Sequence, residues 1–349
     1  MNKRAFLKTC SLLGIGLMAS TRAQAIGIPK LGAQAVIKPK ALKKGGTIAI
    51  VSPSAATVEL KELTLASQLV EALGYKVKLA EHVLARRGHL AGTDAQRAAD
   101  INAQFAAPEV DALFCLRGGS GAARILPLLD YPGIAANPKP LLGYSDITAL
   151  HNALLSQAGL ISFHGPNATS DWNPFNVQQF QRLFEQRQRM HYMNLPRGEG
   201  ELVNSRYLTQ TINPGRSSGR LIGGNLTVLT ALAGSPYLPS FDGAILFLED
   251  TEEAPYRIDR MMSTLKLMGA LDKLSGFVFG DCNLCKPNSG YGSLSLDEIF
   301  ADYIKPLGIP AYRGAMIGHV KQQFILPVGA RVTLDADAGS ITLAESVFS

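Results

Sequence analysis

The sequence of 349 residues has little of what marks several large classes of protein. It has one tryptophan, four cysteines and six histidines. The apolar run at about 10–19 is too short to cross a bilayer, and no later stretch is apolar for long enough. There is no internal repeat, and nothing in the composition indicates disorder, collagen or a coiled coil. With 46% hydrophobic residues, the chain can bury a sizeable core and is long enough for two domains.

An excess of positive charge is also missing from most of the chain. The formal net charge is +6, but nine of the 34 Lys and Arg residues precede Gly45, in a stretch without acids. That leaves 25 basic residues against 28 Asp and Glu residues in 45–349, a net charge of −3. The body of the protein therefore lacks the basic surface expected of a nucleic-acid-binding protein.

The N-terminus predicts an export signal. Lys3 and Arg4 precede an apolar run over about 10–19, and Ala-Gln-Ala at 23–25 is a small-x-small cleavage site. The start, NKRAFLK, is similar to a twin-arginine signal in which Lys replaces the first Arg. An unusual cytosolic N-terminus is the alternative. We expect residues 1–25 to be removed and the mature protein to be soluble and periplasmic, without stable membrane insertion.

The cysteines do not point to a metal site. Cys115 lies in a strand-like run and is expected to be a buried thiol. Cys282 and Cys285 form one C-x-x-C, but no second ligand pair follows at the spacing of a zinc site, and a thioredoxin-like context is missing. A disulfide and a pair of buried thiols both remain open for these two residues.

Strand-like and helix-like segments alternate in the first half of the chain. Apolar spacing and turn residues predict strands at 45–54, 75–83, 110–119, 139–145 and 160–166, and helices at 58–74, 94–107, 122–130 and 146–159. The strands are continuously apolar and the connections are short, which favours a doubly wound, mostly parallel sheet.

The alternation of strand-like and helix-like segments is interrupted at 171–218, which we interpret as a junction between two domains. A Lys-rich linker at 26–44 is expected to precede an N-terminal α/β domain at 45–170. A smaller, β-rich α/β C-terminal domain is expected at 219–349. Its predicted elements are strands at 244–250 and 276–281, helices at 257–271 and 295–308, and a closing hairpin at 330–344.

Three strands of the first half end in Gly- or Ser-rich turns. These turns are SPSA at 52–55, RGGSG at 117–121 and GYSD at 143–146. Ligands of open α/β sheets bind beyond the carboxyl ends of the strands, where backbone N–H groups can hold an anion. RGGSG matches neither phosphate-loop pattern and lacks their Lys, so a phosphate site, an oxyanion hole and an ordinary turn all remain open.

Ser145 has two interpretations. A Ser-Asp pair that opens a helix is typical of an N-cap, which is worth about 1 kcal/mol. Placement directly after an apolar strand favours a nucleophile instead, with the Asp146 N–H facing the same point. The stretch departs from the G-x-S-x-G pattern because Ile147 stands where that pattern has Gly.

A serine nucleophile needs a base and an acid that orients the base. The histidines are His82, His89, His151, His164, His191 and His319. His82 and His89 flank a charged loop and are expected to be solvated. His151 would point away from the serine, and His164 is expected to be a structural histidine with its hydrogen bonds satisfied. His319 follows an apolar run and a Gly, as suits a loop residue at a cleft.

The candidate acids end the apolar strand at 244–250. Glu249 and Asp250 follow five apolar residues, and a carboxylate at the end of a buried strand needs a partner. Capping the next helix could explain Asp250, but it explains Glu249 less readily.

Together these segments resemble the LD-carboxypeptidase (muramoyltetrapeptide carboxypeptidase) family of serine peptidases, from about Gly45 to the C-terminus. The landmarks are VSPS, RGGSGAARILPLLD, GYSDITAL, HGP, GRLIGGNLTVL, LFLEDTEEAPYRIDRMM, GDC, and GH followed by LPVGARVTLD. Each is weak alone, but in this order and spacing they are specific. The resemblance implies a doubly wound N-terminal domain joined to a smaller β-rich domain, with the site between them.

The resemblance implies a catalytic triad of Ser145, His319 and Glu249, with Ser145 as nucleophile, His319 as general base and acid, and Glu249 orienting the imidazole. It also implies an oxyanion hole from the backbone N–H groups of Asp146 and Gly119. Because members of that family are commonly dimers that need no metal, the resemblance also implies a homodimer without a metal or other cofactor.

The implied reaction releases D-Ala from a murein tetrapeptide by hydrolysis of an amide between an L and a D centre. The substrate carboxylate calls for a cation, for which Arg117 and Arg124 are candidates, although both could form structural salt bridges. Tyr144 and Ser120 are further candidates for substrate contacts. Family members often have a larger residue at the position of Ser120, and VKQQF after His319 lacks an expected Asn.

Two alternative functions remain open for a chain with this resemblance. A hydrolase of the same fold could resemble the microcin-immunity peptidases, which cleave aminoacyl-nucleotide antibiotics, although export argues against an intracellular substrate. A catalytically idle muropeptide-binding protein would have no need of all three triad residues.

Overall fold

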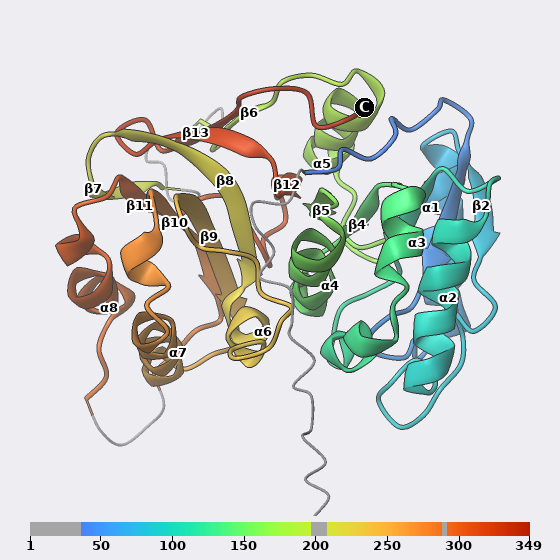
Figure 1. The fold of residues 1–349 in the computed structure, drawn as a ribbon, viewed down its shortest axis with the longest axis horizontal. Coiled ribbons are helices and arrows are strands. Elements are labelled where there is room, and N and C mark those ends of the chain that lie inside the picture. The colour runs from blue at the N-terminus through green and yellow to red at the C-terminus, as the bar shows by residue number, and fades with distance from the viewer. Residues whose placement is uncertain (1–35, 197–207, 288–291) are drawn as a thin grey trace, which may run out of the picture. The chain divides into compact units, whose positions relative to one another are not determined.

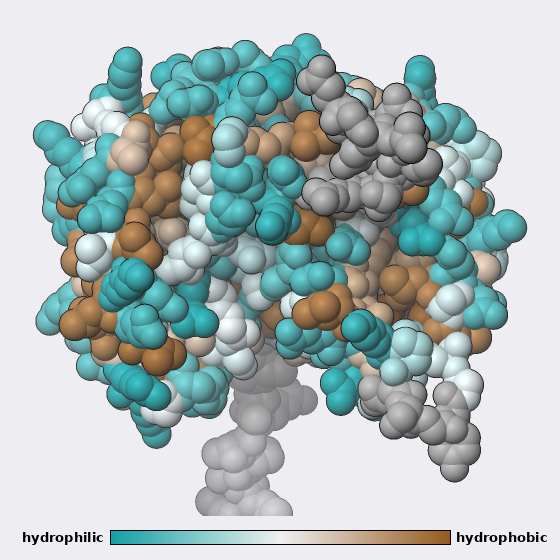
Figure 2. Space-filling view, turned by 180° about the vertical axis from the view of Figure 1, so that it is seen from behind, coloured by the Kyte–Doolittle hydropathy of each residue, from teal (hydrophilic) through white to brown (hydrophobic). Residues whose placement is uncertain are grey.

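The computed structural model of the protein describes residues 36–196, 208–287 and 292–349, whose strands form two sheets flanked by helices (Figure 1). The expected export signal and most of the expected linker lie outside the described residues. No helix of the described part is long and apolar enough to cross a membrane. The face in Figure 2 carries hydrophilic side chains with small groups of hydrophobic ones between them.

The first sheet has the doubly wound arrangement that the alternation of elements predicts. Its order is β12-β5-β4-β3-β1-β2, and β1 to β5 are parallel. The strands are β1 (Thr47–Val51), β2 (Lys76–Leu79), β3 (Ala112–Cys115), β4 (Leu141–Gly143), β5 (Ser162–His164) and β12 (Leu326–Val328). Because the order reverses between β1 and β3, a crevice for a ligand is expected at the carboxyl ends of these strands.

The helices of this half follow the predicted segments, with differences in type. They are α1 (Leu60–Ala72), α2 (Asp94–Ala106), α3 (Tyr131–Ala136), α4 (Thr148–Ala153) and α5 (Pro174–Phe180). The predicted helix at 122–130 is a 3-10 helix, η1 (Ala122–Leu128), that contains Pro127. The predicted helix at 146–159 is divided into η2 (Ser145–Ile147), α4 and a π-helical turn, η3 (Leu154–Ala158). A second π-helical turn, η4 (Gln181–Glu185), continues α5.

The second sheet is mixed and has the order β6-β14-β13-β8-β9-β10-β11-β7. Its strands are β6 (His191–Met193), β7 (Gln210–Asn213), β8 (Arg216–Asn225), β9 (Ala244–Thr251), β10 (Gly276–Asn283), β11 (Ala311–Arg313), β13 (Arg331–Asp335) and β14 (Ser340–Leu343). Strands β8 to β11 are parallel and the other pairs are antiparallel. The helices are α6 (Leu226–Ala231), α7 (Pro255–Leu267) and α8 (Leu296–Tyr303), with short 3-10 turns η5 (Leu271–Lys273) and η6 (Lys305–Leu307).

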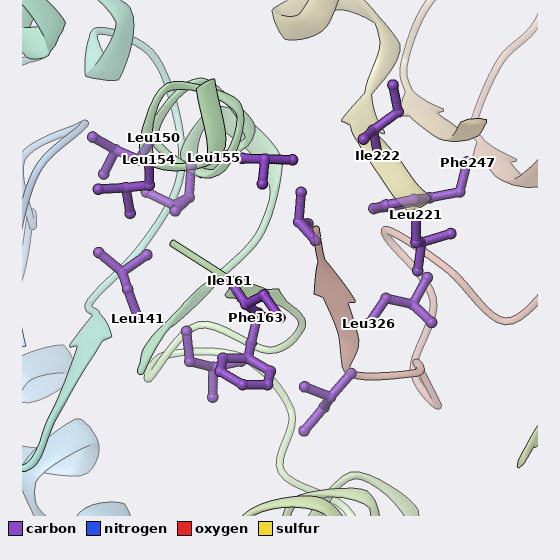
Figure 3. Close-up of a cluster of buried hydrophobic side chains, with 14 of the residues drawn as sticks. Leu141, Leu150, Leu154, Leu155, Ile161, Phe163, Leu221, Ile222, Phe247 and Leu326 are labelled. Carbon is purple, nitrogen blue, oxygen red and sulfur yellow. The ribbon is translucent and has the colours of Figure 1, made fainter. Parts of the chain in front are cut away.

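The two sheets share one apolar core. Strand β12, from the second half of the chain, pairs antiparallel with β5 of the first sheet. Figure 3 shows Leu326 of β12 between Phe163 of the first sheet and Leu221 of the second, and all three side chains are fully buried. Burial of each such side chain contributes about 1.5–3 kcal/mol, so this packing holds the two sheets to each other. The domain boundaries expected from the sequence remain a prediction.

Candidate active site

A cavity of about 420 Å³ opens at the carboxyl edge of the first sheet. Its walls include residues 117–119 after β3, Tyr144 and Ser145 after β4, and His319 from the loop that follows β11. Ser145 and His319 are separated by most of the second half of the chain, and the packing of the two sheets brings them to one cavity. The described parts of the chain contain no group of three His, Cys, Asp or Glu side chains that could hold a metal ion.

Ser145 occupies a strained position. Its φ is +65°, in the left-handed region, where a non-glycine residue costs about 1–3 kcal/mol and persists only because its surroundings hold it there. A Cβ on Gly118 would lie 2.8 Å from the Ser145 Cβ, so only glycine fits against this turn. Tyr144 is the N-cap residue of η2, and no side chain caps that helix, so the interpretation of Ser145 as an N-cap is wrong. The strained strand-to-helix turn is the geometry that the G-x-S-x-G pattern encodes, reached here without its second Gly.

Two buried charges hold the turns around Ser145. The Asp146 carboxylate accepts hydrogen bonds from the Ser54 hydroxyl and from the Ala122 N–H at 2.8 Å. The Arg97 guanidinium, 1% exposed, donates to the backbone oxygens of Pro53 and Gly121 at 2.6 and 2.8 Å. These hydrogen bonds connect the SPSA and RGGSG turns to the turn of Ser145. Asp146 and Arg97 therefore hold in place the turns that border the cavity.

Two backbone N–H groups near Ser145 are open. Within the described residues, neither the Gly119 nor the Asp146 N–H donates to an acceptor. Gly119 lines the cavity with a φ of +118°, and a Cβ there would lie 2.4 Å from the Ala55 Cβ, so the turn requires glycine. Asp146 follows Ser145 in the sequence and is not among the residues that line the cavity. Uncommitted N–H groups beside a hydroxyl are the donors that an oxyanion hole needs.

The buried Glu249 and the partly exposed His319 form a pair at the carboxyl end of β9. The His319 Nδ1 lies 2.8 Å from the Glu249 Oε2, and the carboxylate side chain is fully buried. Because a carboxylate only accepts, Nδ1 carries the proton and Nε2 is left to take one. A Cβ on Gly318 would lie 2.2 Å from the Glu249 Oε2, which explains why glycine precedes His319.

The pKa of His319 reflects opposing effects. Burial lowers it, while the hydrogen bond and the negative charge of Glu249, together with Asp250 and Glu252, raise it by more, so the pKa lies above the usual 6.5. An imidazole that is oriented by a carboxylate and has this basicity can take a proton from a hydroxyl and return it to a leaving group.

Asp250 has a different role from its neighbour. Its carboxylate accepts from Asn225 Nδ2 at 3.1 Å and from the Thr227 N–H and hydroxyl at 3.0 and 2.9 Å. It therefore stabilises the start of α6. Capping of the next helix does not explain Asp250, since α7 begins after Ala254 with no side-chain cap. Burial and the charge of Glu249 raise the pKa of Asp250 to about 6.

The other histidines correct two expectations. His82 is not simply solvated, because its Nδ1 lies 2.9 Å from Asp100 Oδ1. His151 is buried, donating from Nε2 to the Gly143 backbone oxygen and accepting at Nδ1 from the Ser162 hydroxyl, both at 2.8 Å. His164 is fully buried, and neither ring nitrogen has a hydrogen-bond partner among the described residues. The expectation of a satisfied structural His164 is therefore wrong.

The candidates for substrate contacts separate into two groups. Arg117 lines the cavity, with Nη1 3.4 Å from Glu62 Oε2 and a side chain that is 34% exposed. Tyr144 also lines it, and its ring centroid lies 4.8 Å from that of His319. Ser120 is exposed but is not part of the cavity wall. Arg124 is bound to Asp94 at 2.8 Å, outside the cavity, as the salt-bridge interpretation expects.

The cysteine pair also has a clear arrangement. Cys282 and Cys285 form a disulfide at the end of β10, so the interpretation as two buried thiols is wrong. Cys115 is a free thiol, and complete burial raises its pKa far above the usual value. A second cavity, of about 600 Å³, is lined by Cys282 and shares His319 with the first.

Comparison with known proteins agrees with the motifs. Residues 48–165 match the family model described as the LD-carboxypeptidase N-terminal domain, and residues 218–334 match that of the LD-carboxypeptidase C-terminal domain. The chain is 37% identical over 303 residues to a probable murein peptide carboxypeptidase of Bacillus subtilis, covering 85% of this chain and 91% of that protein. It is 34% identical to the murein tetrapeptide carboxypeptidase of Pseudomonas aeruginosa, covering 84% and 94%.

Solved structures show the same fold. The structure of MccF in complex with glutamyl sulfamoyl guanosine has a TM-score of 0.81 and 28% identity, covering 89% of this chain and 99% of that one. The predicted two-domain α/β architecture is thereby confirmed, as is the resemblance inferred from the motifs.

Proposed function

Because the chain belongs to the LD-carboxypeptidase family, we propose that it is a serine carboxypeptidase that releases the terminal D-Ala of murein tetrapeptides without a metal ion. The observation that carries the proposal is the convergence of Ser145 and His319 on one cavity, with Glu249 bound to the imidazole on its far side. The names of the relatives from Bacillus subtilis and Pseudomonas aeruginosa support murein peptides as the substrate class.

The proposed reaction uses Ser145 as nucleophile. His319 Nε2 takes the hydroxyl proton as Oγ bonds to the carbonyl carbon, and the negative charge on the carbonyl oxygen is stabilised by the N–H groups of Gly119 and Asp146. The carbon–nitrogen bond then breaks, and His319 returns the proton to the amine of the departing D-Ala. Water, activated by the same imidazole, hydrolyses the acyl-enzyme and restores Ser145.

Arg117 supplies the positive charge expected for the substrate. It lies on the cavity wall, and its only ionic partner among the described residues is Glu62, at 3.4 Å. A contact this long leaves the guanidinium able to bind the carboxylate of the terminal D-Ala. Tyr144 packs beside His319 and would contact the peptide next to the scissile bond.

A second candidate is hydrolysis of an aminoacyl nucleotide. It is favoured by the structural match to MccF, solved with glutamyl sulfamoyl guanosine. The expected export argues against it, but that location and the expected homodimer both remain predictions. The nucleotide candidate would use the same three residues, so the substrate alone distinguishes the two.

The experiment is a substrate panel with the purified protein. Free and disaccharide-linked tetrapeptides with Lys or diaminopimelate at the third position are compared with an aminoacyl nucleotide, and D-Ala or amino acid release is measured. We expect D-Ala release from at least one tetrapeptide. Release from the nucleotide alone would favour the second candidate, and binding of tetrapeptide without turnover would indicate a muropeptide-binding protein.

A further inference from the structure

His164 lies at the end of β5 and faces the oxygen of Glu249 that His319 does not contact. Its Nε2 is 3.9 Å from Glu249 Oε1, and both side chains are fully buried. In the described part of the chain, neither nitrogen of His164 nor Oε1 of Glu249 has a hydrogen-bond partner. A potential donor and an acceptor are therefore left open opposite each other, immediately behind the pair formed by Glu249 and His319.

Buried polar atoms are rarely left without a partner, because they lose their hydrogen bonds to water. A hydrogen bond between nitrogen and oxygen spans about 2.7–3.2 Å, so the gap is too long by about 1 Å. A small rotation of either side chain closes such a distance. Within the described residues, no other side chain offers either atom a partner at hydrogen-bond distance.

The groups around His164 determine its charge. The rings of Tyr144, His151 and Phe247 pack against it, at centroid distances of 6.1, 6.2 and 5.3 Å. Burial, and then the positive charge that His151 or His319 would carry, hold the pKa of His164 well below its usual value. His164 is therefore neutral and has a single N–H to donate. A neutral His164 adds no positive charge beside the Glu249 carboxylate that binds His319.

We propose that His164 donates a hydrogen bond from Nε2 to Glu249 Oε1 and thereby fixes the carboxylate that orients His319. His164 is then a positioning residue that acts through Glu249 and does not touch the substrate. This inference rests on the proposed function, because it assigns His164 to the same catalytic unit. The carboxylate would be held at both oxygens, by His319 at Oε2 and by His164 at Oε1.

The first test compares variants that keep or remove the donor. In His164→Gln, the amide nitrogen can reach Oε1. The equally polar side chain in His164→Asn is too short to bring its amide nitrogen to Oε1. His164→Leu removes the donor altogether. We expect His164→Gln to retain most of kcat. His164→Asn and His164→Leu should lose on the order of tenfold to hundredfold in kcat, with KM little changed. Losses of this size are seen when a residue that orients a metal-binding side chain is removed, and His164 would orient Glu249 in the same way.

A double-mutant cycle separates positioning from general packing. If His164 acts through Glu249, then His164→Leu should cost less than about twofold in kcat when Glu249 is already alanine. An equal loss in both backgrounds would overturn the proposal, as would equal activity of the Gln and Asn variants. Should His164→Leu fail to fold, as judged by thermal unfolding, the Gln and Asn pair decides on its own.

A measurement on the free protein keeps this inference distinct from the proposed function. The ¹H resonance of the proton between His319 Nδ1 and Glu249 is followed in protein labelled with ¹⁵N-histidine. It should persist in His164→Gln and be shifted or lost in His164→Leu. If the wild type released no D-Ala, the proposed function would be wrong, while this resonance would still test His164. An unchanged resonance in His164→Leu would contradict the inference.

Discussion

The carboxyl edges of the two sheets each carry buried acids, but these acids are partnered differently. After β4, Asp146 accepts from Ser54 and Ala122 and holds the turns around the cavity. At the end of β9, Glu249 has one oxygen on His319 and the other unpartnered within the described residues. The first edge therefore has a carboxylate committed to structure, while the second edge has one available for proton chemistry.

The contrast repeats between neighbours at the second edge. Asp250 is occupied by Asn225 and Thr227, and its hydrogen bonds stabilise the start of α6. Glu249, one residue earlier, points to the opposite side of the strand and reaches His319. The alternation of a β-strand thus separates a structural carboxylate from a functional one within two residues.

The largest expected effect comes from this pair of neighbours. Glu249→Gln should lower kcat by about 10⁴-fold, since a neutral amide neither stabilises the imidazolium nor fixes its tautomer. The matched change Asp250→Asn keeps the hydrogen bond between Glu249 and His319 and removes only a weaker charge effect on the pKa of His319, so kcat should stay within about tenfold. Steady-state D-Ala release measures both. Similar losses in the two variants would remove the distinction between the neighbours.

The structural role of Asp146 predicts an effect on stability. Asp146→Ala leaves the Ser54 hydroxyl and the Ala122 N–H buried without their acceptor, which should lower the free energy of unfolding by about 2–4 kcal/mol. Urea denaturation followed by circular dichroism provides the measurement. Glu249→Ala, compared in the same way, should cost less, because it frees fewer buried donors. A larger loss for Glu249→Ala would reverse the assignment of the two acids.

The cavity wall predicts a smaller effect on substrate binding. Arg117→Ala should raise KM for tetrapeptide about tenfold, the value of one charge-assisted hydrogen bond at a partly exposed site, with kcat less affected. Arg124→Ala is the control, because that guanidinium is bound to Asp94 outside the cavity. If both variants had the same KM as the wild type, Arg117 would not bind the substrate carboxylate.

The smallest effect is a shift in pH dependence. His319 must be neutral to act as a base, and its pKa is raised above 6.5, so kcat/KM should rise with pH around a midpoint above that value. In Glu249→Gln the midpoint should move to lower pH, because burial remains and the carboxylate is gone. A midpoint that stays in place would show that another group titrates.

The same pair makes folding stability depend on pH. The folded state favours protonated His319, so the stabilisation is present in full below about pH 6.5, the ordinary pKa of histidine, and is lost as pH rises through the folded pKa. Urea unfolding at a series of pH values from 6 to 9 should show this decline in the wild type and less of it in Glu249→Gln.

Much of this arrangement could be predicted from the sequence. The apolar strands at 139–145 and 244–250 end in GYSD and LFLED, and ligands of α/β sheets bind beyond the carboxyl ends of strands, so Ser145 and Glu249 could be selected. That β4 and β9 belong to different sheets could not be predicted. Strands β6 and β12 could not be predicted either, because, unlike the equally short β4 and β5, they lie outside the alternation of strands and helices, and their pairing partners are distant in the chain.

Other features depend on three-dimensional contacts that no local pattern encodes. The left-handed conformation of Ser145 is imposed by its neighbours, although the sequence lacks the usual second Gly. Whether His164 finds a hydrogen-bond partner depends on how β5 and β9 lie next to each other, which the sequence does not show. The sequence therefore favoured a histidine with its hydrogen bonds satisfied, whereas the structure leaves both ring nitrogens without a partner among the described residues. The requirement for glycine at 318 likewise depends on the position of the Glu249 carboxylate.

The proposed mechanism requires Ser145, from the edge of the first sheet, and His319, from the second half of the chain, to act as one catalytic unit. The most direct test measures kcat for D-Ala release in Ser145→Ala, in His319→Ala and in the double variant. Each single change should lower kcat by at least about 10⁴-fold, and the double variant should be no slower than Ser145→Ala by more than a few-fold. Losses that multiply in the double variant, or full activity of Ser145→Ala, would show that the two residues do not act as one catalytic unit.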